Sequence, residues 1–245
     1  MKLRVCTLIV LFATMSSIYA QPKGQKSIPM IGSVAPSFTA ETTEGVLNFP
    51  EDYGKSWKIL FSHPKAFTPV CTHEILHMAL IQDQFKDLDV KVVILSTDTK
   101  ETHQQWKESM EEILSKRAVP VKIGFPFVDD RDAEIANLYG MIHDEVSPYY
   151  TIRGLFIIDP DNIIQTVVFY PISVGRNTEE IVRKVQALQT VRSSGYYTPA
   201  NWKPFNDLLI PQYRYTEEEL RNKPELLNDY YQIGSYLWYK KIWKE

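Results

Sequence analysis

Apolar and polar positions follow two different periods along this chain, and segments of the two kinds alternate. Residues 57–62 form an apolar run that predicts a strand, and the continuous β-branched run 90–96 predicts a buried central strand. Runs 154–158 and 163–169 are separated by Asp-Pro-Asp-Asn at positions 159–162. They predict a hairpin whose turn uses the proline and the last asparagine.

Four segments repeat their apolar residues at helical spacing and predict amphipathic helices: residues 72–85, 100–115, 131–138 and 178–191. Strands that alternate with helices along a chain are typical of a sheet covered on both faces by helices. The hairpin places two strands of this sheet antiparallel, so the expected fold class is α/β with a mixed sheet flanked by helices.

A domain boundary is predicted near Ser193, Ser194 and Gly195, where helical periodicity stops and the chain becomes rich in Tyr, Trp and Pro. Residues 29–192 are expected to form the main domain, and residues 193–245 a C-terminal extension too short to bury much of a core alone. Because aromatic residues are favoured at interfaces, the extension is expected to dimerise the protein as a homodimer. Packing on the main domain, or an ordered surface extension in a monomer, stays open.

Residues 1–20 have the layout of a secretory signal peptide, with Lys2 and Arg4 before a short apolar stretch and small residues near position 20. That stretch is shorter than the roughly 20 residues needed to cross a bilayer, and no later segment is long or apolar enough to do so, so no membrane span is expected. An uncleaved anchor is the alternative. We expect a secreted protein. A net charge of −3 with no basic stripe makes nucleic acid an unsuitable partner.

Only two cysteines occur, and Cys6 lies in the predicted signal peptide, which leaves Cys71 as the single thiol of the mature chain. A lone cysteine in a secreted chain indicates intermolecular pairing or a reactive thiol. At the first turn of the helix expected to begin near Thr72, unpaired backbone N–H groups and the helix dipole favour the thiolate. Thr68 can direct a hydroxyl at a substrate, and Pro64 and Pro69 stiffen the loop.

Thiolate formation alone is too small an effect for a fast catalyst. The site must also hold its substrate in line and stabilise a leaving group, so an arginine is expected to complete it.

The stretch Pro64-x-x-x-Thr68-x-x-Cys71 matches the signature of the peroxiredoxin family, and residues 63–74 as a whole resemble its 1-Cys class. The resemblance covers roughly residues 29 to 211. It continues through further segments at positions 32–38, 96–98, 125–130, 170–171, 175–177 and 198–202.

This resemblance implies a thioredoxin-like fold with a small C-terminal peroxiredoxin domain, and it implies that Cys71 is the peroxidatic cysteine. By the same similarity Arg153 is the active-site arginine and Arg176 the second arginine, for which a structural role is equally open. Glu74 and His63 match residues that help to order the site.

The implied activity is reduction of hydrogen peroxide and organic hydroperoxides through a sulfenic acid. An external thiol reductant must regenerate the thiol, because the chain offers no resolving cysteine. No cofactor and no metal are implied.

Two positions depart from the closest members of the family. Ala66 stands where they carry aspartate, and His73 replaces a threonine and adds a titratable group near the sulfur. His73 and His77 lie four residues apart on one helical face near Cys71, which leaves a metal site as an alternative.

Two other functions are alternatives on the sequence. Gly54-Lys55-Ser56-Trp57-Lys58 resembles a lipase Gly-x-Ser-x-Gly element, but Lys58 replaces the second glycine, so lipase activity is not expected. The second is a secreted interaction or matrix protein that kept the fold and lost turnover. It draws on the aromatic tail after Gln212.

Overall fold

The computed structural model describes residues 27–212, 215–234 and 236–242. The predicted signal peptide, residues 1–20, lies outside the described residues. Two sheets are present in the described part: a seven-stranded sheet of order β2-β1-β5-β4-β3-β6-β7 and a three-stranded sheet of order β8-β10-β9. The strands are β1 Phe38–Thr42, β2 Gly45–Phe49, β3 Trp57–Ser62, β4 Val90–Ser96, β5 Phe127–Asp129, β6 Arg153–Ile158, β7 Ile164–Tyr170, β8 Leu208–Leu209, β9 Tyr230–Ile233 and β10 Leu237–Lys240.

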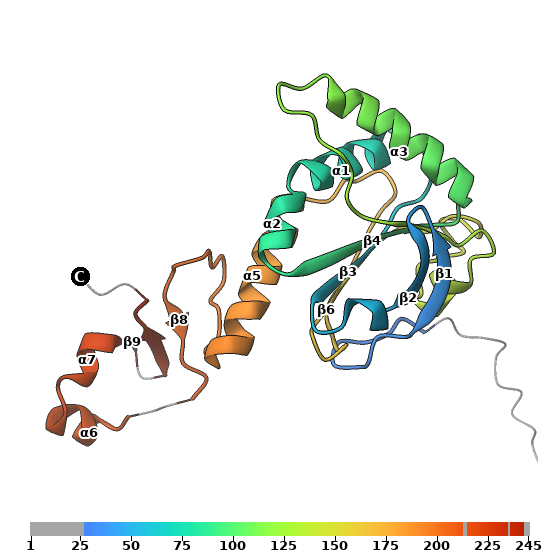
Figure 1. Cartoon of the computed structure of the whole chain (residues 1–245). Helices are drawn as coiled ribbons and strands as arrows, with labels where there is room; N and C mark the ends of the chain where they lie inside the picture. The colour runs from blue at the N-terminus through green and yellow to red at the C-terminus, as the bar shows by residue number, and fades with distance from the viewer. Residues whose placement is uncertain (1–26, 213–214, 235, 243–245) are drawn as a thin grey trace, which may run out of the picture.

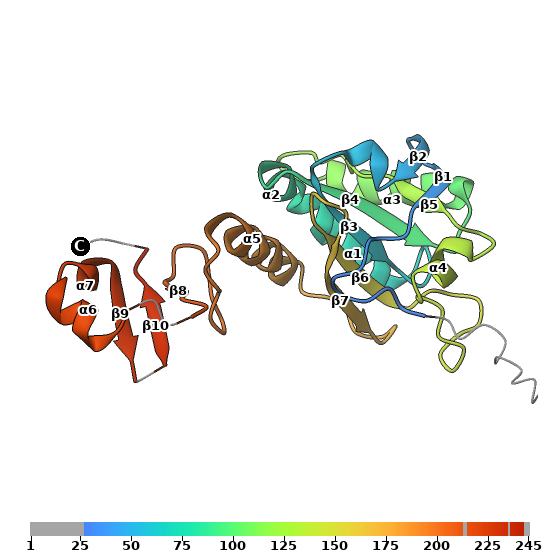
Figure 2. The same cartoon turned by 90° about the horizontal axis from the view of Figure 1, so that it is seen from below.

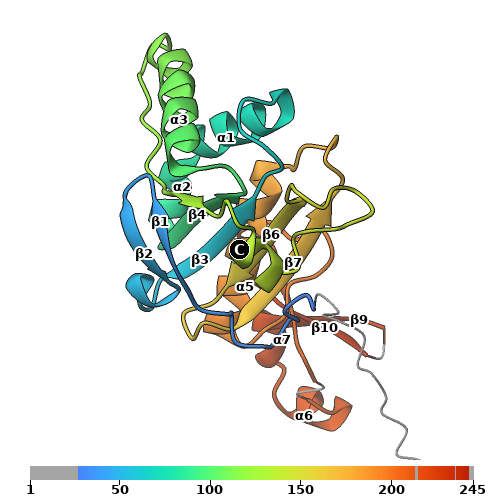
Figure 3. The same cartoon turned by 90° about the vertical axis from the view of Figure 1, so that its right-hand side faces the viewer.

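Helices lie against the large sheet and continue beyond it into the C-terminal segment (Figures 1 and 2). They are α1 Pro69–Leu80, α2 Gln82–Asp87, α3 Lys100–Ser115, α4 Glu134–Leu138, α5 Thr178–Ser194, α6 Glu217–Asn222 and α7 Leu226–Asp229, with a short 3₁₀ helix, η1, at Glu51–Tyr53. In Figure 3 α1 and α3 lie side by side above the sheet.

The centre of the large sheet consists of β3, β4 and β6. Strand β3 pairs parallel with β4 and antiparallel with β6, so the sheet is mixed, as predicted. Every residue of β3 and β6 is buried, because both faces of these strands are covered. A continuous apolar run is the pattern that such a strand requires.

Two hydrophobic clusters cover the two faces of the sheet. One cluster joins the sheet to α1, α3 and α5 through residues such as Met78, Trp106 and Val185. The other joins it to α4 and the N-terminal strands through residues such as Phe49, Ala136 and Tyr139. The expectation of helices on both faces is therefore correct, with the heavier layer on the side of α1.

The predicted helix at 72–85 is wrong in its bounds, since it is two helices, α1 and α2, that meet at Ile81. Helix α1 also begins earlier, at Pro69, because proline is well suited to the first helical position. The predicted helix at 131–138 begins only at Glu134. Asp130 accepts hydrogen bonds from the backbone N–H groups of Ile135 and Ala136, which fixes the start of α4.

The C-terminal segment follows α5, which ends at Ser194 where Gly195 adopts a left-handed conformation with φ of 70°. The small sheet β8-β10-β9 lies beyond the end of α5, away from the large sheet (Figures 1 and 2). The segment buries a few aromatic and aliphatic side chains: Trp202, Leu208, Tyr230 and Trp238. Division of the chain into domains at 192/193 stays a prediction.

None of the helices in the described ranges combines the length and the apolar character needed to cross a bilayer.

Candidate active site

Cys71 lies in the first turn of α1 and is the third residue of this helix, which begins at Pro69 directly after the extended residue Thr68. Its side chain is fully buried. Strand β3 ends at Ser62, so residues 63–68 form a short loop that brings the chain from the centre of the sheet to this helix N-terminus. The unpaired N–H groups of the first turn favour a negative charge on the sulfur.

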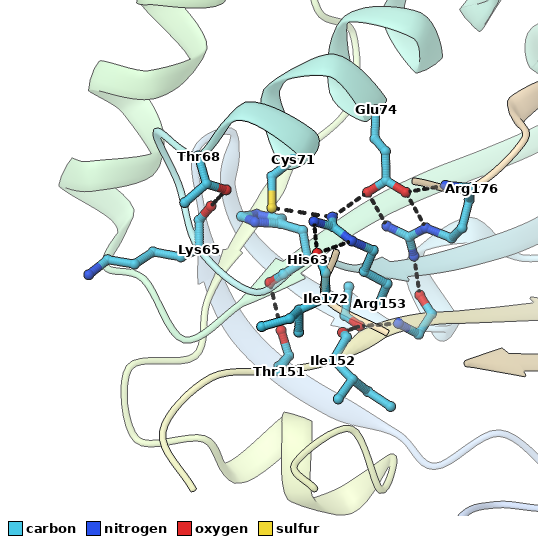
Figure 4. A network of polar contacts seen from close by, with 12 residues as sticks. His63, Lys65, Thr68, Cys71, Glu74, Thr151, Ile152, Arg153, Ile172 and Arg176 are labelled. Carbon is cyan, nitrogen blue, oxygen red and sulfur yellow. Dashed lines mark hydrogen bonds and ion pairs between the residues drawn. The ribbon is translucent and has the colours of Figure 1, made fainter. Parts of the chain in front are cut away.

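Arg153 is the first residue of β6, the strand that pairs with β3. Its Nη1 atom donates a hydrogen bond to the Cys71 sulfur at 3.3 Å and another to Glu74 Oε2 at 2.7 Å (Figure 4). Its Nε atom donates to the carbonyl oxygen of Ile172 at 3.0 Å. The guanidinium is held from three sides and is 2% exposed, so it is fixed before any substrate arrives.

Glu74 lies three residues after Cys71 on α1 and joins the two arginines (Figure 4). Its Oε1 atom accepts hydrogen bonds from the backbone N–H and the Nε atom of Arg176, at 2.7 and 2.9 Å. Its Oε2 atom accepts from Arg153 and from Nη2 of Arg176, at 2.7 and 2.9 Å. Burial raises the pKa of Glu74, but the hydrogen bonds and charges of the arginines outweigh burial and hold it below its ordinary value.

Arg176 is fixed on its other side as well. Its Nη1 atom donates to the carbonyl oxygen of Gly154 at 2.7 Å, and its guanidinium carbon lies 3.3 Å from the centroid of the Phe61 ring. The buried cluster thus holds two guanidinium groups and one carboxylate. A thiolate on Cys71 supplies the second negative charge, so the cluster is electrically balanced when the sulfur is ionised.

Thr68 sits on the loop immediately before α1, and its side chain is half-buried. Its hydroxyl donates its proton to the carbonyl oxygen of Lys65 at 2.9 Å and not to the Cys71 sulfur (Figure 4). Pro64, in the same loop, is buried. Because the hydroxyl proton is engaged with the loop, the lone pairs of Thr68 are left to accept a hydrogen bond from another group.

The loop is tied to the sheet at two further points, which were not predicted from the sequence. Asp98 accepts hydrogen bonds from the Ala66 backbone N–H and the Ser96 hydroxyl, both at 2.8 Å. The hydroxyl of Thr151 donates to the carbonyl oxygen of His63 at 2.6 Å. The available signal was Ser-x-Asp at the end of a predicted central strand, where polar side chains collect beside the neighbouring loop.

His63, the first residue of the active-site loop, is fully buried, and its ring lies against α3. Its ring centroid is 4.8 Å from that of Trp106 and 5.8 Å from that of His103. Burial, followed by the positive charges of His103, Arg176 and Arg153, lowers the pKa of His63 well below its ordinary value. His63 is therefore a neutral ring at the site.

His73 and His77 lie on α1 with ring centroids 4.5 Å apart, and both are more accessible than the buried Cys71. Their ring nitrogens belong to no group of three metal-binding side chains identified in the described ranges. The sequence interpretation that joined them with the sulfur in a metal site draws no support from this arrangement.

Ser56 precedes strand β3 and donates a hydrogen bond to Asp89 at 2.7 Å. Lys58, which replaces the second glycine of the lipase-like element, is fully buried and donates to the carbonyl oxygen of Gly54. A nucleophile elbow needs a strand-to-helix turn at the serine, and this serine precedes a strand instead. The expectation that lipase activity is absent stays a prediction.

The structure thus brings Cys71, Glu74, Arg153 and Arg176 into one hydrogen-bonded cluster. The loop that carries Thr68 borders the cluster.

Comparison with known proteins gives one family and consistent relatives. Residues 31–167 match the AhpC/TSA family. A peroxiredoxin of Methanosarcina mazei is 43% identical over 185 residues, which cover 75% of this chain and 84% of that protein. The mitochondrial peroxiredoxin PRX1 of Saccharomyces cerevisiae is 40% identical over 187 residues, covering 74% of this chain and 70% of that protein.

Two solved structures share the fold. A yeast mitochondrial 1-Cys peroxiredoxin superposes with a TM-score of 0.76 at 36% identity, covering 87% of this chain and 100% of that chain. A cysteine-to-serine mutant of the peroxiredoxin 6 of Arenicola marina superposes with a TM-score of 0.75 at 31% identity, covering 88% of this chain and 99% of that chain. The expected thioredoxin-like fold is therefore confirmed.

Proposed function

This chain belongs to the AhpC/TSA family and is a peroxiredoxin, and we propose that it reduces hydroperoxides through Cys71 alone, by a 1-Cys mechanism. Membership of the family implies thiol-dependent peroxidase activity. The observation that carries the finer proposal is the 3.3 Å contact between Arg153 Nη1 and the sulfur of Cys71, the free cysteine in the described part of the chain.

The reaction follows from the charges in the cluster. The Cys71 thiolate attacks one oxygen of the peroxide, an S–O bond forms, and the O–O bond breaks. The departing hydroxide or alkoxide takes up a proton and leaves as water or alcohol, while the sulfur becomes a sulfenic acid. Negative charge moves from the sulfur onto the leaving oxygen, and the fixed guanidinium of Arg153 is placed to stabilise it.

Thr68 orients the peroxide in this proposal. A hydroperoxide O–H needs an acceptor, and the Thr68 hydroxyl has free lone pairs because its own proton is donated to Lys65. The peroxide is then held between an acceptor on the loop and the donor groups of Arg153. Holding a reactant in line between two fixed groups lowers the entropic part of the barrier.

An external thiol completes the cycle. It attacks the Cys71 sulfenic acid and releases water, and a second thiol resolves the mixed disulfide and restores the thiol. The yeast 1-Cys neighbour is described as resolved via glutathione/thioredoxin systems, which supports a thiol reductant of one of these kinds here.

The proposal is tested on the purified protein and its Cys71→Ser variant. We expect hydrogen peroxide and cumene hydroperoxide to change the fluorescence of the buried Trp106 in a stopped-flow instrument, at a rate well above that of a free thiol. We also expect dimedone to trap a sulfenic acid on Cys71. The variant should show neither signal. Oxidation of the native protein no faster than that of free cysteine would instead favour an interaction protein that retains the fold.

We propose in addition that residues 1–20 direct secretion and that the protein is a homodimer. The first rests on the sequence pattern of residues 1–20, and N-terminal sequencing of protein recovered from culture medium tests it. The second is supported by exposed aromatic residues on the C-terminal segment, among them Tyr197 and Tyr236. Light scattering coupled to size exclusion gives the mass directly, and a monomer mass would contradict the proposal.

A further inference from the structure

The side chains of His63, Asp98 and His103 converge behind the active-site loop. One ligand atom of each lies within 4.8 Å of the others, and this is the group of metal-binding side chains found among the described residues. His63 follows β3, Asp98 follows β4, and His103 belongs to the first turns of α3. These elements are adjacent because β3 and β4 are paired neighbours in the sheet.

The histidine rings are buried but not satisfied by the protein. Both side chains are 0% exposed. In the described part of the chain, however, three of their ring nitrogens lack a hydrogen-bond partner: both nitrogens of His63 and the Nδ1 atom of His103. Buried polar groups are normally paired, and unpaired ones indicate a partner that is still to be identified. An unprotonated imidazole nitrogen is a good ligand for zinc-class metal ions.

The hydrogen bonds around Ser96 determine which nitrogen of His103 is free. The Ser96 hydroxyl donates its proton to Asp98 Oδ2 and lies 2.8 Å from Nε2 of His103. Because the hydroxyl proton is already used, Nε2 of His103 carries the hydrogen of that second bond. The Nδ1 atom of His103 therefore has a free lone pair, and the Ser96 contact orients the ring as outer partners orient metal-binding histidines.

Charges near His103 favour a cation there. The negative charges of Asp98 and Asp129 stabilise a positive charge at His103. The positive charges of Arg176 and Arg153 oppose a positive charge at His63. A bound ion is therefore expected nearer His103 and Asp98. The side chain of Asp98 is 11% exposed, so one ligand of the group is accessible to solvent.

From this convergence we propose that His63, Asp98 and His103 form a binding site for one divalent transition-metal ion of the zinc class, behind the active-site loop. Zinc bonds to nitrogen and oxygen are about 2.0–2.2 Å long, so tetrahedral ligand atoms lie roughly 3.3 Å apart. In the present structure one ligand atom of each residue lies within 4.8 Å of the others, so small side-chain rotations are needed to reach that spacing. The site uses two nitrogens and one oxygen and leaves the Cys71 sulfur free.

The test titrates Co²⁺ into the chelator-treated full-length protein, follows the visible d–d absorption, and then displaces Co²⁺ with Zn²⁺. We expect one ion per chain. Asp98→Asn and His103→Gln should each weaken Co²⁺ binding at least about tenfold. His77→Gln, which changes the histidine pair on α1, and Cys71→Ser are the matched controls and should bind as the native protein does.

X-ray absorption at the zinc edge of the native protein keeps the proposal testable if a variant fails to fold. Two imidazole ligands, at least one oxygen ligand and no sulfur are expected. Three results would overturn the proposal: no stoichiometric binding, binding lost in His77→Gln but kept in His103→Gln, or a sulfur ligand in the absorption spectrum.

Discussion

Arg153 places its Nη1 atom 3.3 Å from the sulfur of Cys71, although 82 positions separate the two residues in the chain. The same nitrogen also donates to Glu74, so the contact with the sulfur is fixed by a buried ion pair. Since this arginine is already in place, binding a peroxide requires no costly reorganisation of charge.

Arg153→Lys is expected to slow the oxidation of Cys71 by hydrogen peroxide by about 10²- to 10³-fold. Lysine keeps the charge but cannot donate at once to the sulfur, to Glu74 and to the Ile172 carbonyl as the planar guanidinium does. Stopped-flow fluorescence measures the rate. Arg192→Lys, at a partly exposed arginine, is the control and should leave the rate unchanged. A loss below threefold in Arg153→Lys would remove Arg153 from the mechanism.

Thr68→Val is expected to lower the same rate constant about 3- to 10-fold, the effect of losing one hydrogen bond between neutral groups. Thr68→Ser keeps the hydroxyl and should retain most of the activity. Both variants need matched unfolding curves, because the hydroxyl also donates to Lys65. Equal rates for Val and Ser would show that the hydroxyl does not touch the peroxide.

Glu74→Gln is expected to destabilise the fold by about 3–5 kcal/mol at pH 7, because it leaves two buried guanidinium groups without their carboxylate. Urea unfolding followed by far-UV circular dichroism measures the loss. Glu180→Gln, which removes a partly exposed partner of Arg183, is the control, and its cost should stay below about 1 kcal/mol.

The destabilisation by Glu74→Gln should depend on pH. Burial raises the pKa of Glu74, but the hydrogen bonds and charge of Arg176 and the charge of Arg153 hold it below its ordinary 4.5 in the folded protein. The carboxylate therefore contributes its full stability above pH 4.5, and that contribution is lost as the pH falls through the lower folded pKa. The gap between native protein and variant should shrink in that acid range. A gap that stays constant down to the acid limit of folding would contradict the assignment.

Gly154→Ala is expected to destabilise the protein by about 1–3 kcal/mol through overpacking. A Cβ atom at Gly154 would lie 3.0 Å from the Ser62 hydroxyl, 3.1 Å from the Phe169 ring and 3.3 Å from Met141. Thermal unfolding measures the effect. Gly124→Ala is the matched control, because its new Cβ meets only the flexible end of Gln82. Equal melting temperatures for the two variants would show that strands β6 and β7 have room to move.

Several elements could be predicted from the sequence because their signals are local. Strands β3 and β4 and helix α3 have the predicted bounds, since continuous apolar runs and helical spacing indicate them without reference to the rest of the chain. The short strands β1, β2 and β5 were missed. They derive their stability from pairing with one another and with β4, and such pairing leaves only a weak pattern in the sequence.

The break between α1 and α2 at Ile81 was also missed, because the apolar spacing runs through it. The same difficulty applies to the site. Asp98 and Thr151 hold the active-site loop through backbone groups of Ala66 and His63. Ser-x-Asp at the end of β4 marks Asp98 as a polar position, but the spacing of residues does not specify which backbone groups Asp98 and Thr151 bind.

Three features can be predicted from the amino-acid sequence, because they lie within a few adjacent residues. They are the active-site loop, the single thiol of the expected mature chain and the helix N-terminus at which this thiol lies. Two other features emerge only in the folded chain: Arg153 and Arg176 share the carboxylate of Glu74, and His63 meets His103. The physical reason is the order of the strands. Strand β3 pairs with β4 on one side and with β6 on the other, which brings distant residues together at one end of these central strands. Local periodicity does not specify that strand order.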